Sequence, residues 1–142
     1  MSKLRTVSWI VLALVGALAM LGALGSANLA YRGEFPLGGV SITEIASGRE
    51  PVLLALRGAR ATAAAWAAGW AALFLVVVLG PYRRGDVAAW WGILASAVVP
   101  ALVAGARVPL IGVRAGSEGP LVMLAIVVIA LLLDLRRLSR RA

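Results

Sequence analysis

Apolar residues fall into four long runs, separated by shorter polar segments rich in Gly and Pro. The runs predict membrane-spanning helices at about residues 7–25, 61–79, 87–106 and 119–135. A helix rises about 1.5 Å per residue, so roughly 20 apolar residues cross the hydrocarbon core of a bilayer. The fourth run is the weakest, because its uninterrupted apolar part is short. The pattern therefore predicts an all-α integral membrane protein, a four-helix transmembrane bundle with an ordered extracytoplasmic loop.

The first run, Val7–Gly25, has two interpretations. It holds 19 residues without a charge and follows Lys3 and Arg5. Small residues after it would suit a signal peptidase, so residues 1–27 are either a retained helix or a cleaved signal. The run exceeds the usual 7–15 residues of a signal peptide's apolar region, which favours the retained helix.

Residues 26–60 form the longest polar connection, which we predict to be an ordered outer loop that packs onto the helix ends. Glu50 and Pro51 suit the start of the second helix, because Pro is favoured at the first helical position and an acid complements the helix dipole. We interpret the charges of the outer side as ion pairs that hold the loop in place: Glu34, Glu44, Glu50 and Glu118 with Arg49, Arg57, Arg60, Arg107 and Arg114.

The turn Tyr82–Asp86 joins the second and third helices. Gly80 and Pro81 are predicted to end the second helix, since a proline disfavours helix in the residue before it. Gly85 suits a positive φ, and Asp86 suits the N-cap of the third helix. Arg83 and Arg84 are interpreted mainly as cytoplasmic charges that position the turn. The alternative is that they bind an anionic lipid or a partner.

The distribution of charge sets the predicted orientation. The net charge is +8, from 14 Lys and Arg against 6 Asp and Glu. Eight basic residues lie in short segments on the side that holds both termini: Lys3, Arg5, Arg83, Arg84, Arg136, Arg137, Arg140 and Arg141. Because short basic segments stay in the cytoplasm, we expect a multi-pass protein of the cell membrane with both termini cytoplasmic. Asp134 is expected at that interface, exposed or paired with Arg137.

Composition narrows the chemistry. Hydrophobic residues make up 62% and charged residues 14%, which favours lipid as the solvent. The absence of Cys and His excludes disulfides, thiolate nucleophiles and Cys/His zinc sites. We predict no catalytic residues, no metal, no cofactor and no nucleic-acid partner. No acid or base lies at the centre of a run, which argues against an ion-coupled pump.

Small residues spaced by four predict close helix packing, which van der Waals contact drives in lipid. The rows that contain glycine are the strongest: Gly22 and Ser26 in the first helix, Ala61, Ala65 and Gly69 in the second, and Ala88, Gly92, Ser96 and Pro100 in the third. A row of alanines, Ala64, Ala68 and Ala72, lies beside the one in the second helix. An alternative is that alanine is merely abundant here.

Four residues are candidates for a hydrophobic ligand pocket. Trp66 and Trp70 are four apart and share a helix face. Pro100 removes the usual hydrogen bond to the carbonyl of Ser96, and the resulting kink could open a cavity. The alternative is that all four serve packing or face lipid.

The segment from Gly80 to Trp91, Gly-Pro-Tyr-Arg-Arg-Gly-Asp-Val-Ala-Ala-Trp-Trp, resembles a group of small, uncharacterised four-helix bacterial membrane proteins, broadly the DoxX-like proteins. With Leu56–Arg60 and the alanine-rich helix, the resemblance covers roughly residues 41–106. Some proteins of this type are membrane subunits of quinone-linked oxidoreductases. The resemblance implies an accessory role and transfers no catalytic residue.

The sequence favours a non-enzymatic multi-pass membrane protein, either an accessory subunit or a binder of a hydrophobic ligand such as a lipid or quinone. A small transporter or a membrane subunit of a quinone-linked oxidoreductase is the alternative. Expected partners are membrane lipids, with a protein partner or a second copy of the chain also open. The ligand, the oligomeric state and the identity of any partner complex do not follow from the residues.

Overall fold

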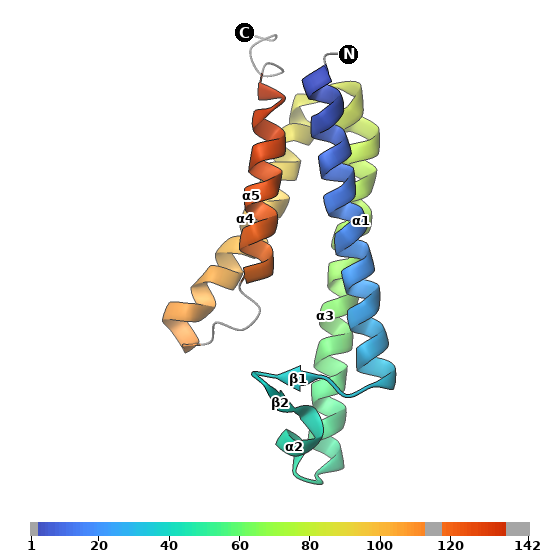
Figure 1. Cartoon of the computed structure of the whole chain (residues 1–142), viewed down its shortest axis with the longest axis vertical. Helices are drawn as coiled ribbons and strands as arrows, with labels where there is room; N and C mark the ends of the chain where they lie inside the picture. Colours follow the sequence, from blue (N-terminus) through green and yellow to red (C-terminus); the bar gives the residue numbers. More distant parts are fainter. Residues whose placement is uncertain (1–2, 113–117, 136–142) are drawn as a thin grey trace. The chain divides into compact units, whose positions relative to one another are not determined.

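The computed structural model describes residues 3–112 and 118–135, and most of these residues are helical (Figure 1). The prediction of an all-α fold is confirmed, apart from one two-stranded antiparallel ribbon. In chain order the elements are α1 (Lys3–Arg32), β1 (Pro36–Leu37), β2 (Val40–Ser41), α2 (Ile42–Ala46), α3 (Glu50–Val77), the π-helical η1 (Val78–Tyr82), α4 (Val87–Ile111) and α5 (Glu118–Leu132).

Among the described residues, three helical segments are long and apolar enough to cross a membrane: α1, α3 continued by η1, and α4. Helix α5 is also apolar, but at 15 residues it is shorter. The long helices extend beyond the predicted spans, because α1 continues to Arg32 and α3 starts at Glu50. Of the predicted outer loop, only the segment between these two residues lies outside the long helices.

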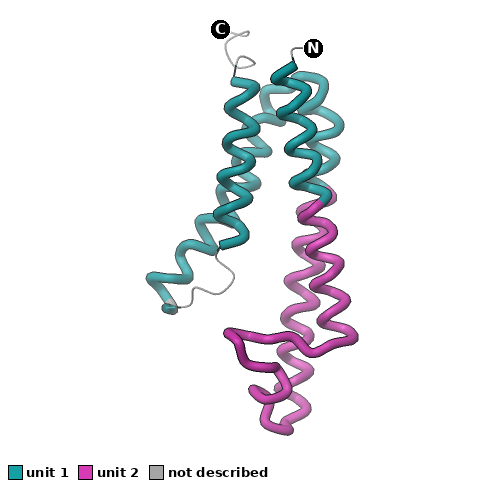
Figure 2. Tube along the Cα trace, in the orientation of Figure 1, with its two compact units in different colours: residues 1–17, 73–142 teal, residues 18–72 magenta. Residues whose placement is uncertain are grey.

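The chain divides into two compact units (Figure 2). Unit 1 comprises residues 1–17 and 73–142, and unit 2 comprises residues 18–72. The division therefore passes through both α1 and α3.

In unit 1, the start of α1 packs along the end of α3, and α4 packs antiparallel to α5. Ser8, Leu12 and Gly16 form the buried face of α1. Gly16 marks a close approach, since a Cβ there would lie 2.7 Å from Leu75 Cδ2. In the other helices, buried residues also recur mainly at three or four residues. They are Phe74, Val78 and Tyr82 along α3 and η1; Ala89, Ile93, Ala97, Ala101 and Ala104 on α4; and Val127, Ala130 and Leu131 on α5, followed by Asp134 just beyond it.

The small-residue row predicted for the third helix is not the one that packs. The buried row of α4 lies one position along, at Ala89, Ile93, Ala97 and Ala101. Ala88 and Gly92 are exposed, and no atom lies within 4 Å of a Cβ placed on Gly92. A shift of one residue turns the helix face by about 100°. The face that packs carries the larger side chains Trp90 and Ile93, and Trp90 hydrogen-bonds to Leu131 of α5.

The small-residue row predicted for the second helix is likewise turned away from the core. Ala65 and Gly69 are exposed. Of the alanine row beside it, Ala64 is buried, Ala68 is half-buried and Ala72 is exposed, while Ala71 is buried. Gly69 also has open space around its Cβ position.

In unit 2, the end of α1 and the start of α3 are joined by a structured connection. The ribbon pairs Pro36 with Ser41 and turns through Gly38 and Gly39, both at positive φ. Ser41 then caps α2 by accepting from the Thr43 amide. Phe35, Ile42 and Ala46 are buried, so the connection has a small apolar core of its own.

The prediction that Gly80 and Pro81 end the second helix is wrong. The helix continues as the π-helical turn η1 through Tyr82. Proline biases the preceding residue away from helix without forbidding it. Amides of the following turn donate to carbonyls around the proline: the Arg83 N–H donates to Gly80 and Val78, and the Asp86 N–H donates to Pro81.

Candidate functional site

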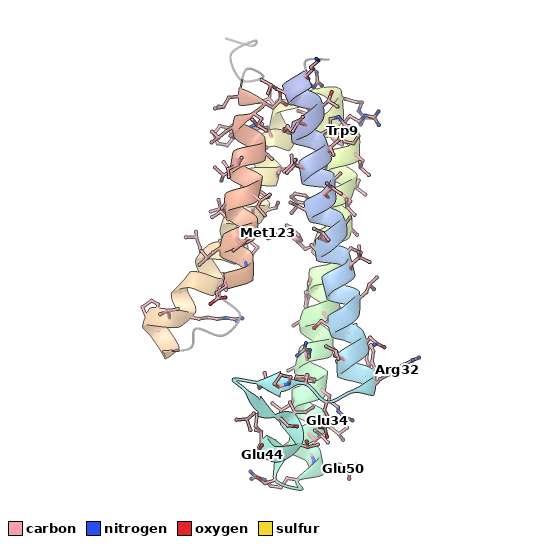
Figure 3. The ribbon with its side chains drawn as sticks, viewed as in Figure 1. Trp9, Arg32, Glu34, Glu44, Glu50 and Met123 are labelled. Carbon is pink, nitrogen blue, oxygen red and sulfur yellow. The ribbon has the colours of Figure 1, made fainter. Side chains whose placement is uncertain are left out.

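Polar side chains gather at one end of unit 1, where the start of α1 meets η1 and the turn that follows it. We call Arg5, Ser8, Trp9, Tyr82 and Arg83 the end cluster. Figure 3 labels Trp9 close to this end of α1. The cluster joins two segments that are more than 70 residues apart in the chain, as the separation of 74 between Ser8 and Tyr82 shows.

The centre of the end cluster is a pair of buried hydroxyls. Ser8 Oγ lies 2.6 Å from the Tyr82 hydroxyl, and both side chains are 0% exposed. Burying a hydroxyl without a partner is unfavourable, and these two groups satisfy each other. The pair therefore fixes the register of α1 against η1.

Arginine side chains surround this pair. Arg5 Nη2 donates to the carbonyl of Arg83 at 2.7 Å, and the Arg83 guanidinium lies 4.9 Å from the centre of the Trp9 ring. Gly85 has φ of 103°, and a Cβ on it would lie 3.0 Å from Arg5 Nη2. The positive φ therefore favours glycine at position 85, and the end of the flexible Arg5 side chain lies beside it.

The turn after η1 agrees with the local predictions. Asp86 caps α4, because its Oδ1 accepts from the Ala88 amide at 2.8 Å. The positive φ predicted for Gly85 is confirmed. Arg83 and Arg84 are both exposed. Neither guanidinium forms a hydrogen bond or an ion pair with any residue that the structure describes.

On the other side of unit 1, polar groups join α4 to α5. Trp90 Nε1 donates to the carbonyl of Leu131 at 3.3 Å, inside the core. Asp134 lies one turn further along and is only 7% exposed. The expectation of an exposed carboxylate is therefore wrong, because this face of the chain after α5 turns inward. The predicted partner Arg137 lies outside the described residues.

The pocket candidates divide between the units. In unit 2, Trp66 is 78% exposed and Trp70 is half-buried. In unit 1, Ser96 and Pro100 are half-buried, and the Ser96 hydroxyl donates to the carbonyl of Ile93 on its own helix at 2.8 Å. Helix α4 continues through Pro100 to Ile111. Within its own unit, the Trp66 side chain is therefore largely uncovered.

Comparison with known proteins gives no family for this chain. No family model, curated protein or solved structure matches it. The function is therefore inferred from its own residues and geometry.

In unit 2, the connection between α1 and α3 is held by contacts other than the predicted ion pairs. Arg60 Nε donates to Ser26 Oγ at 3.1 Å, and its guanidinium lies 4.1 Å from the centre of the Phe35 ring. Glu34 accepts hydrogen bonds from the hydroxyls of Thr43 at 3.0 Å and Ser41 at 3.4 Å. Among the described residues, Glu34 and Arg60 therefore contact hydroxyls and an aromatic ring and do not pair with each other.

The Ser8–Tyr82 pair was not predicted from the sequence. The available signal was that Ser8 is the one hydroxyl residue in the run Val7–Gly25. A hydroxyl in such a run needs a partner, and Tyr82 lies at the end of the next long helix.

Proposed function

We propose that the chain is a multi-pass protein of the cell membrane with four spans and both termini cytoplasmic, and that it acts as a non-enzymatic accessory subunit. The supporting observation is the large apolar surface that its helices leave uncovered. In the most apolar part of α1 and of α3 continued by η1, 22% of the residues are buried within the chain, and in α4 33%. Such faces are stable in lipid or against other transmembrane helices.

The small-residue rows favour a partner helix over lipid alone. Gly69 on α3 and Gly92 on α4 are exposed, with no atom within 4 Å of their Cβ positions. Small residues on an outward face let another helix approach closely. The DoxX-like resemblance of the segment after Gly80 points in the same direction, toward a subunit role.

Membrane insertion and orientation are tested by extraction and reporter fusions. We expect the protein to stay in membranes washed with alkaline carbonate. A cytoplasm-active reporter fused after Arg141 should be active, and the same reporter inserted at Gly39 should be inactive. Release by carbonate would overturn the membrane assignment, and the reversed reporter pattern would overturn the orientation.

The subunit role is tested by crosslinking in native membranes and purification in mild detergent. We expect a defined complex, with a protein partner or a second copy, that Gly92→Leu weakens by filling the outward row. Gly105→Leu is the matched control, because Gly105 also has open space and lies on another side of α4. A monomer that carries a bound lipid or quinone and is unaffected by Gly92→Leu would favour the ligand-binding alternative instead.

A further inference from the structure

We propose that Arg83 and Arg84 bind the phosphodiester headgroup of anionic phospholipids, with an acyl chain lying on the exposed face of α3. The proposal rests on the proposed membrane location of unit 1. It follows from the direction of two guanidinium groups, from the absence of a hydrogen bond or ion pair between either of them and a described residue, and from the apolar surface beside them.

The Arg83 side chain is directed along the span. Its backbone carbonyl accepts from Arg5, whereas its guanidinium lies 4.9 Å from the centre of the Trp9 ring. Trp9 is four residues, about 6 Å, further along α1 than Arg5. The Arg83 guanidinium therefore lies closer to the level of the membrane interface, where tryptophans are enriched beside the lipid headgroups.

The Arg84 side chain folds back in the same sense. Its Nη2 lies 3.9 Å from the Cβ position of Gly80, one turn earlier in η1. The absence of a side chain at Gly80 leaves space beside the helix there. Arg84 thus places a second cation alongside the last turn of the helix, next to the apolar residues that precede the turn.

Both guanidiniums have donors available. Neither side chain hydrogen-bonds or pairs with any described residue. A guanidinium stacked on an aromatic ring keeps its N–H groups at its edge, where they match two oxygens of a phosphate. Lys3 is exposed nearby in α1 and adds positive charge. The arrangement therefore favours a ligand with an anionic phosphodiester over an uncharged apolar ligand.

An apolar track beside Arg84 distinguishes a phospholipid from a soluble phosphate. Leu79 on η1 and Val76 and Leu73 on α3 are exposed and recur at three residues, starting next to Gly80. A phosphate held by Arg84 would have its acyl chain along this row. Exposed Trp91 and Leu4 give further apolar surface at the same end of unit 1.

Native mass spectrometry of the full chain in mild detergent tests the proposal, with phosphatidylglycerol, phosphatidylcholine and inorganic phosphate as probes. We expect phosphatidylglycerol to bind the wild-type protein in preference to phosphatidylcholine. In Arg83→Ala/Arg84→Ala its affinity should fall roughly thirtyfold, since each basic residue contributes about a factor of five at an anionic surface. The control Arg32→Ala/Arg49→Ala removes two exposed charges from unit 2 and should change the affinity less than threefold.

A lysine variant separates the guanidinium geometry from charge alone. Arg83→Lys/Arg84→Lys keeps both charges and loses the planar fork, so we expect an intermediate loss of roughly fivefold. This variant also serves if the alanine variant fails to fold, as judged by size-exclusion chromatography and thermal unfolding. Trp9→Leu removes the ring under Arg83 and should weaken binding by a smaller factor.

Several outcomes would overturn the proposal. Equal loss in the Arg32→Ala/Arg49→Ala control, or unchanged affinity in the lysine variant, would indicate general charge attraction. Full displacement of the lipid by inorganic phosphate would indicate a soluble-anion site. These results are distinct from failure of the proposed function, which would appear as release of the wild-type protein from carbonate-washed membranes.

Discussion

The two units hold α1 against α3 by different means. In unit 1, the contacts are enclosed: Ser8 and Tyr82 share a hydrogen bond at 0% exposure, and Gly16 lets the Leu75 side chain approach closely. In unit 2, the polar contact between these helices is only part-buried: Arg60 Nε on α3 donates to Ser26 Oγ on α1 at 3.1 Å. The hydrogen bond from Thr43 to Glu34, in the connection between the helices, is exposed. The glycines of the helices there, such as Gly22, have open space around them.

This difference indicates where sequence changes should matter. A buried hydroxyl that loses its partner costs about 1–3 kcal/mol, whereas a surface hydrogen bond competes with water and contributes little net. Overpacking destabilises only where neighbouring atoms occupy the space. Unit 1 should therefore be sensitive at its α1–α3 contact, and unit 2 should tolerate equivalent changes.

The largest expected effect is that of Gly16→Leu. A Cβ at position 16 would lie 2.7 Å from Leu75 Cδ2 and 3.1 Å from Phe74 Cδ1, so a larger side chain must separate the helices. We expect a loss of about 2–3 kcal/mol in the free energy of unfolding, measured by denaturant titration in mixed micelles. Gly22→Leu makes the same change in the same helix where space is open, and should lie within about 0.5 kcal/mol of wild type. Equal losses in both variants would refute a close approach at Gly16.

Tyr82→Phe should have the next largest effect. It removes one member of the hydroxyl pair and leaves Ser8 Oγ buried without that partner. We expect a loss of about 1–2 kcal/mol in unfolding free energy. Ser8→Ala/Tyr82→Phe should cost less than the sum of the single variants, because both hydroxyls are then gone. Strict additivity in this double-mutant cycle would contradict direct coupling of the two groups.

Features set by neighbouring residues were predicted from the sequence. The apolar runs gave the helices, and Gly85 and Asp86 gave the turn and the cap, because backbone conformation and capping depend on a few adjacent residues. The continuation through Pro81 was not predicted, because it depends on amides from the following turn reaching the carbonyls around Gly80.

Features set by the packing of distant segments were not predicted. In an alanine-rich helix several faces carry small residues at a spacing of four, so the sequence did not distinguish the row of Ala89 from that of Ala88. The Ser8–Tyr82 pair requires the register of α1 against η1 across a separation of 74 residues. The burial of Asp134 likewise depends on how α5 packs against α4.

A moderate effect is expected at the helix caps, and it compares the two units directly. Asp86→Ala removes the acceptor of the Ala88 amide at the start of the long helix α4, and should cost about 1 kcal/mol. Asp86→Asn keeps a capping oxygen and should be nearly neutral. Ser41→Ala removes the cap of α2, a five-residue helix, where the distance to the Thr43 amide is longer, 3.3 Å. Its expected cost is smaller, and a larger loss than for Asp86→Ala would show that α2 contributes more stability than its length indicates.

The smallest effect is expected for Thr43→Val, the counterpart in unit 2 of removing the Tyr82 hydroxyl. Thr43 Oγ1 donates to Glu34 Oε1 at 3.0 Å and lies 2.6 Å from Ser41 Oγ, and all of these contacts are at the surface. Water replaces the lost hydroxyl, and the change in unfolding free energy should stay within about 0.5 kcal/mol. Thr62→Val is the control, because Thr62 is exposed on α3 and forms none of these hydrogen bonds. A loss in Thr43→Val as large as that of Tyr82→Phe would mean that water does not reach the Glu34 carboxylate. Burial would then fail to explain the difference between the two units.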